Sequence, residues 1–296
     1  MRFIVAMLVA VMAGLGSAQA DDRLSVVATF SILGDFARNV GGDRVAVTTL
    51  VGPDSDSHVY TPSPADAKTI AAARLVIVNG LGLEGWLPRL VKSSGGKAAT
   101  VIATKGIVPR RIADGHSHDP SEADPHAWQS VSNAKIYVTN IRDALIAADP
   151  AGADTYRANA AAYLAKLDTL DAEVRAAVAQ IPPERRRVIS THDAFGYFAA
   201  AYGIDFIAPQ GASTDSEPSA RDIAAIISQI RREKIPAVFL ENISDPRLIR
   251  RIAAETGAAI GGTLYSDSLS GEKGPVPTYI DMVRHNIKAL TRALAS

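Results

Sequence analysis

Short apolar runs alternate with amphipathic stretches along most of the chain. The apolar runs are nearly continuous, as is typical of parallel strands covered on both faces, and they predict strands at residues 25–30, 45–51, 75–79, 100–104, 188–191, 237–241 and 259–264. Apolar positions that recur every three or four residues predict helices at 32–40, 132–148, 194–202, 220–233 and 278–294. This alternation in both halves indicates an α/β fold of two lobes, each with a mostly parallel sheet flanked by helices.

A single apolar stripe runs through residues 153–180, between the two alternating units. Its members follow one another at helical intervals: Tyr156, Ala160, Tyr163, Leu167, Leu170, Val174 and Ala177. The segment contains neither Gly nor Pro and is followed by Pro182-Pro183, so it predicts an uninterrupted helix of about seven turns. We interpret it as one long rigid helix that joins a first lobe at 21–150, through residues 151–181, to a second lobe at 182–296. The alternative is an ordinary helix of the second lobe.

The first twenty residues have the pattern of a secretory signal peptide. Arg2 precedes an apolar run at residues 3–15, and Ala18-Gln19-Ala20 has the small-x-small form of a cleavage site. The chain has no cysteine that could carry a lipid anchor after this segment. We therefore expect a cleaved signal and a periplasmic protein, although simple secretion would give the same pattern. Lys and Arg total 31 and Asp and Glu total 31, so there is no electrostatic reason to expect nucleic acid as a partner.

Histidines follow several of the predicted strands. His58 lies in the loop after residues 45–51, His192 directly follows 188–191, and Asp267 comes shortly after 259–264, while His126 precedes the helix at 132–148. Ligands of open α/β sheets collect outside the carboxyl ends of strands, so these four side chains could converge if the lobes face each other. Three imidazoles and one carboxylate suit Zn²⁺, and without cysteine no thiolate can take part. The alternatives are a solvated or capping role for each His and a helix N-cap role for Asp267.

Four ordered motifs give the chain a resemblance to a known family: GPDSDSHVYTPSPAD at 52–66, DPHAW at 124–128, THDAFGYF at 191–198 and DSL at 267–269. Across nearly the whole mature chain it resembles the receptors of zinc and manganese ABC importers, the ZnuA/TroA-like family. The resemblance implies that His58, His126, His192 and Asp267 are the metal ligands and that the partner is an ABC transporter permease in the membrane. Manganese-type members tend to carry Glu at the position of His192, so the resemblance favours zinc as the transported ion. Thr61 departs from the Glu of many relatives.

Two further histidines lie in the polar loop at 114–124, just before His126. His116 and His118 could capture zinc transiently and pass it on, and the alternative is a flexible surface loop. A periplasmic zinc metallochaperone is a second candidate partner, and we expect a monomer. His285 falls on the predicted terminal helix, and we interpret it as part of a solvated face.

The predicted function is capture of an ion, not catalysis, because four protein ligands leave no open position for an activated water. A zinc hydrolase with three His and a metal-bound water is one rival. Its general base could only be Glu241, which is otherwise a polar residue at a strand end. A manganese or iron receptor on the same scaffold is a second rival, although sites for harder cations usually recruit more oxygen ligands. A metallochaperone that serves another protein instead of an importer is a third.

Overall fold

The computed structural model describes residues 23–112 and 123–295. The predicted signal peptide and the loop with His116 and His118 lie outside these residues. The first sheet has the order β2-β1-β3-β4, with every pair parallel. Its strands are β1 (Leu24–Phe30), β2 (Val45–Val51), β3 (Leu75–Val78) and β4 (Ala99–Ile102), and the helices of this lobe are α1 (Ser31–Gly41), α2 (Pro64–Ala72), α3 (Leu87–Ser94) and α4 (Val131–Ala148).

The second lobe repeats this design with the strand order β6-β5-β7-β8, again parallel throughout. Its strands are β5 (Arg187–Ile189), β6 (Asp205–Ile207), β7 (Ala237–Glu241) and β8 (Ala259–Leu264), and its helices are α6 (Gly196–Tyr202), α7 (Ala220–Glu233), α8 (Arg247–Thr256) and α9 (Tyr279–Leu294). The fold is therefore the predicted pair of parallel-sheet lobes.

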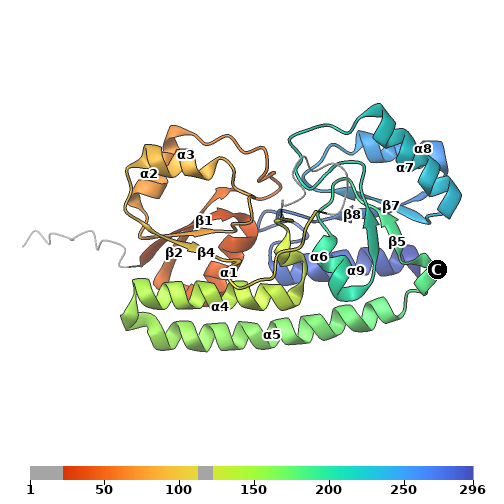
Figure 1. The fold of residues 1–296 in the computed structure, drawn as a ribbon. Coiled ribbons are helices and arrows are strands. Elements are labelled where there is room, and N and C mark those ends of the chain that lie inside the picture. The colour runs from red at the N-terminus through yellow and green to blue at the C-terminus, as the bar shows by residue number, and fades with distance from the viewer. Residues whose placement is uncertain (1–22, 113–122, 296) are drawn as a thin grey trace, which may run out of the picture.

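The long helix α5 (Ala153–Ala179) runs beneath both lobes (Figure 1). It packs against α1 and α4 on one side of the molecule and against α9 on the other. The apolar stripe faces these helices as predicted, except at its end, where Val178 is buried and Ala177 is only half-buried. The exact division of the chain at residues 150 and 181 stays a prediction.

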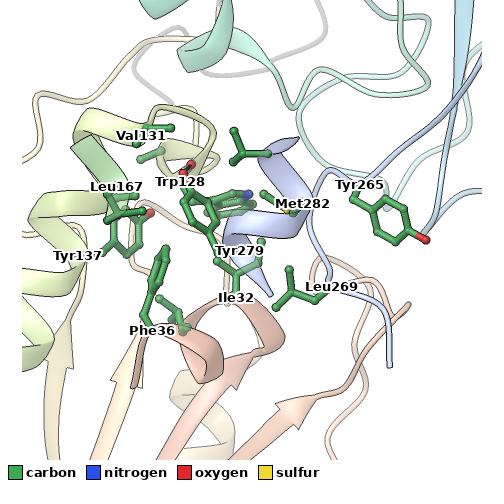
Figure 2. Packing of buried hydrophobic residues seen from close by; sticks show 14 of the residues in the cluster. Ile32, Phe36, Trp128, Val131, Tyr137, Leu167, Tyr265, Leu269, Tyr279 and Met282 are labelled. Carbon is green, nitrogen blue, oxygen red and sulfur yellow. Dashed lines mark hydrogen bonds between the residues drawn. The ribbon is translucent and has the colours of Figure 1, made fainter. Parts of the chain in front are cut away.

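One hydrophobic core continues from the first lobe into the second. Phe36 of α1 packs against Tyr279 of α9, with ring centroids 4.8 Å apart, and Trp128 lies beside them (Figure 2). The Tyr279 hydroxyl donates to the Trp128 carbonyl at 2.7 Å, and the Trp128 indole N–H donates to the Ser266 carbonyl at 2.8 Å. An aromatic pair such as Phe36 and Tyr279 contributes about 0.5–1.5 kcal/mol beyond its buried area. The lobes are therefore packed to each other by more than the connecting helix.

Three details differ from the prediction. β4 lies at the edge of the sheet, where it pairs with β3, and its side chains are mostly exposed instead of covered on both faces. β5 ends at Ile189, two residues earlier than predicted, and His192 instead forms an isolated parallel bridge with Gln210. The short elements α2, α3, β6 and α8 were not predicted. Among the described helices, none is both long and apolar enough to cross a membrane.

Candidate metal centre

The four predicted side chains meet between the lobes. His58 lies in the loop after β2, and His126 lies just before a short 3-10 helix at Ala127–Gln129. His192 follows β5, and Asp267 follows β8. One donor atom from each side chain lies within 4.8 Å of all the others. Each lobe thus contributes two donors, because the carboxyl ends of both sheets face the same cleft.

The spacing of these atoms is that of ligands around one ion. Asp267 Oδ2 lies 3.1 Å from Nε2 of His58 and 3.2 Å from Nε2 of His192, and the Nε2 atoms of His58 and His126 are 3.2 Å apart. Ligand atoms at about 2.0–2.1 Å from a zinc ion give tetrahedral edges of about 3.3–3.4 Å. These three distances are close to such edges, and all four donors lie within 4.8 Å of one another, so the cluster is compact enough for a small divalent cation.

Burial and charge also suit a cation. The side chains of His126, His192 and Asp267 are fully buried, and that of His58 is 5% exposed. Asp267 Oδ1 has no hydrogen-bond partner among the described residues. A buried carboxylate oxygen without a donor costs free energy, and a cation at this point would remove that cost.

Two carboxylates hold the outer nitrogens of the imidazoles. Asp124 Oδ1 lies 2.8 Å from Nδ1 of His126, and Glu241 Oε2 lies 2.6 Å from Nδ1 of His192. Such contacts fix the ring orientation and leave Nε2 as the metal-facing atom. Sequence reasoning missed both roles. Asp124 stands in the DPHAW motif, so its position was a usable signal, but nothing local connects Glu241 with His192.

Glu241 is not a strand-end surface residue. Its side chain is fully buried, and its Oε1 accepts the backbone N–H groups of Thr191 at 2.7 Å and of His192 at 3.1 Å. Both carboxylate oxygens are therefore engaged on the far side of the imidazole. This geometry removes the support for Glu241 as a general base.

In the metal-free protein, the imidazoles of His126 and His192 bind protons more tightly than free histidine does. Burial lowers the pKa of His126, but the carboxylates of Asp267 and Asp124 outweigh this effect and raise the pKa to about 9. His192 behaves alike: burial lowers its pKa, and Glu241 and Asp267 raise it well above its usual value. Burial raises the pKa of Asp267, but the two imidazoles hold it well below its usual range. A bound cation must therefore displace protons from Nε2.

His285 does not belong to this centre. Its Nε2 lies 2.9 Å from the Thr263 carbonyl, and its ring packs edge-on against Tyr265. The side chain is half-buried, so the predicted solvated role is wrong. His285 instead connects α9 to β8 through its contact with the Thr263 carbonyl.

Two parallel-sheet lobes with a buried donor cluster between them define a two-lobed metal-binding receptor. The family model of ZnuA, zinc-uptake complex component A periplasmic, matches residues 26–293. The chain belongs to this family of periplasmic metal-binding receptors of ABC importers, which work with a membrane permease.

Similar proteins carry several metals in their names. The iron-binding protein YfeA of Yersinia pestis is 38% identical over 91% of this chain and 86% of its own length. The manganese-binding lipoprotein MntA of Bacillus subtilis is 36% identical over 93% and 91%. The periplasmic zinc binding protein TroA of Treponema pallidum is similar in structure, with a TM-score of 0.87, 32% identity and coverage of 93% of this chain and all of that one.

A Mn-bound periplasmic metal binding protein from Candidatus Liberibacter asiaticus has a TM-score of 0.81 and 35% identity, and the match covers 91% of this chain and 98% of that one. The relatives share the fold and bind divalent metals, and they place the protein outside the cytoplasm.

Proposed function

We propose that this protein captures Zn²⁺ in the cleft between its lobes and delivers it to the permease of an ABC importer. His58, His126, His192 and Asp267 would be the ligands. The observation that supports this most directly is the convergence of three imidazoles and Asp267 between the lobes, together with a buried Asp267 Oδ1 that has no hydrogen-bond partner among the described residues. A cleaved signal peptide at residues 1–20 would deliver the receptor to the periplasm.

The preference for zinc rests on the donor set. Three imidazoles and one carboxylate form a borderline-soft site, whereas manganese and calcium sites recruit more oxygen. The second candidate function is a receptor for manganese or iron on the same scaffold, because some relatives are named for those ions. Because affinity for most sites follows the Irving–Williams order, tighter binding of zinc than of manganese in vitro is necessary for this proposal but does not alone identify the ion in the cell.

Transport without catalysis also follows from the donor set. An ion held by all four donors has no open position at which water could be activated. Both oxygens of Glu241 are taken by His192 and neighbouring N–H groups, so Glu241 is not free to act as a base.

The test is metal analysis of the purified protein together with one ligand variant. We expect one zinc per chain in the wild type and Zn²⁺ binding that outcompetes excess Mn²⁺. His192→Ala should weaken zinc binding by more than the 10- to 100-fold that is typical of lost outer partners. His285→Ala is the matched control, since it removes a half-buried imidazole outside the centre, and it should keep full affinity. Unaltered zinc affinity in His192→Ala would remove this residue from the ligand set.

A further inference from the structure

The four donors are not held equally. His126 and His192 have a carboxylate on Nδ1 and are fully buried, and Asp267 is buried between them. Within residues 23–112 and 123–295, no carboxylate is paired with Nδ1 of His58. His58 also lines a pocket of about 230 Å³. An ion that enters or leaves the centre therefore meets His58 first.

His58 is positioned through its backbone, by Asp56. Oδ1 of Asp56 accepts the His58 N–H at 2.8 Å. Its other oxygen, Oδ2, accepts the hydroxyl of Thr214 at 2.5 Å, although Thr214 lies 158 residues further along the chain. One carboxylate thus connects the His58 loop of the first lobe with the second lobe.

Thr214 stands on a segment that is anchored to the other side of the metal centre. The Asp193 N–H donates to the carbonyls of Gln210 at 3.1 Å and Gly211 at 3.2 Å, directly beside His192. The Gln210 side chain donates to the Thr214 carbonyl at 3.1 Å. The hydrogen bond between Thr214 and Asp56 therefore fixes the position of the His58 loop relative to His192.

The beginning of the His58 loop is tied to the second lobe by other bonds. The Asp54 N–H donates to the Leu269 carbonyl at 2.9 Å, and the Asn242 amide donates to Asp54 Oδ1 at 3.1 Å. Near His58 itself, the Trp86 indole donates to the Ser57 carbonyl at 3.0 Å, but both belong to the first lobe. Apart from the contact of the His58 imidazole with Asp267, the end of the loop that carries the ligand is joined to the second lobe through Asp56 and Thr214.

We propose that Asp56 is a positioning residue for His58, that Thr214 fixes it from the opposite lobe, and that this pair sets the rate at which the ion leaves. The proposal rests on the proposed role of His58 as a ligand. Both residues are half-buried and line a pocket of about 460 Å³, so water can compete for their hydrogen bond. A bond of this kind opens more readily than the buried carboxylate–imidazole contacts. His58 is then the first ligand to be released.

The experiment measures the release of Zn²⁺ from the loaded full-length mature protein. An excess of 4-(2-pyridylazo)resorcinol traps the ion and reports its release by absorbance in a stopped-flow instrument. Thr214→Val keeps the shape of the side chain and removes the donor, and we expect zinc to leave about tenfold faster with little change in its association rate. Thr214→Ser restores the hydroxyl and should restore the wild-type rate.

Two comparisons separate positioning from a general loss of structure. Thr139→Val removes a similar half-buried hydroxyl, which bonds the Lys135 carbonyl within α4, and should leave the release rate unchanged. In an Asp56→Ala background, Thr214→Val should have no additional effect, since the two residues act through one bond.

An unchanged release rate in Thr214→Val, or the same acceleration in Thr139→Val, would overturn the inference while the receptor function stands. Failure of the wild type to bind one zinc ion would instead overturn the proposed function.

Discussion

Glu241→Gln tests how strongly the outer shell of the centre controls the metal site. In the wild type, Oε2 faces Nδ1 of His192 at 2.6 Å and Oε1 accepts two backbone N–H groups, from Thr191 and His192. Glutamine has one oxygen and one NH₂ group in the same space. The two backbone donors require the oxygen, so the NH₂ group must face Nδ1.

This arrangement changes the tautomer of His192. An Nδ1 that faces an NH₂ group must accept a hydrogen bond, and the ring proton then moves to Nε2, which is the atom 3.2 Å from Asp267 Oδ2. Zinc requires a free lone pair on this atom. Turning the amide round would restore the tautomer but leave two buried N–H groups without an acceptor, at about 1–3 kcal/mol each.

We therefore expect Glu241→Gln to weaken zinc binding about 100-fold, the upper end for a lost outer partner, which corresponds to about 2.8 kcal/mol. Competition against a chelator of known affinity measures this. Asp35→Asn is the matched control: Asp35 is also buried and accepts the Tyr279 N–H at 3.0 Å, but it contacts none of the four donors. It should lower stability and leave zinc affinity within about twofold. Wild-type affinity in Glu241→Gln would refute the tautomer argument.

Three further outcomes follow from the same centre. Because the pKa of His126 is about 9, zinc should displace at least one proton at pH 7, and its apparent affinity should rise about tenfold per pH unit for each proton displaced, until about pH 9. Calorimetry in buffers of different ionisation enthalpy counts the protons, and a count of zero would contradict the pKa direction. The metal-free protein should show the opposite trend, since a raised His pKa contributes stability that is full below about pH 6.5 and lost as pH rises through about 9. Zinc at a thousandfold excess over its Kd should stabilise the fold by about 4 kcal/mol and raise Tm by about 8–16 °C in a thermal melt, and an unchanged Tm would exclude a site that forms only in the folded protein.

Apolar periodicity was enough to predict the fold class and most of the elements, because it is a local property of the chain, but it missed the short elements α2, α3, β6 and α8. The runs at Val45–Val51, Ala237–Glu241 and Ala259–Leu264 became β2, β7 and β8 with the predicted bounds. The sequence also placed His58, His192 and Asp267 in loops that follow parallel strands, and such residues lie at the carboxyl ends of the strands. His126 lies in a loop before a helix and has no such signal.

Contacts between residues far apart in the sequence became visible with the folded structure. Neither the contact of Glu241 with His192 nor that of Asp56 with Thr214 has a local signal, because each depends on how the sheets and lobes close against one another. The exposed edge of β4 and the half-buried position of His285 were set in the same way, by the neighbours that the fold supplies. Periodicity tells which face of an element is apolar, but a hydrogen bond between distant segments is set by the packing that brings them together.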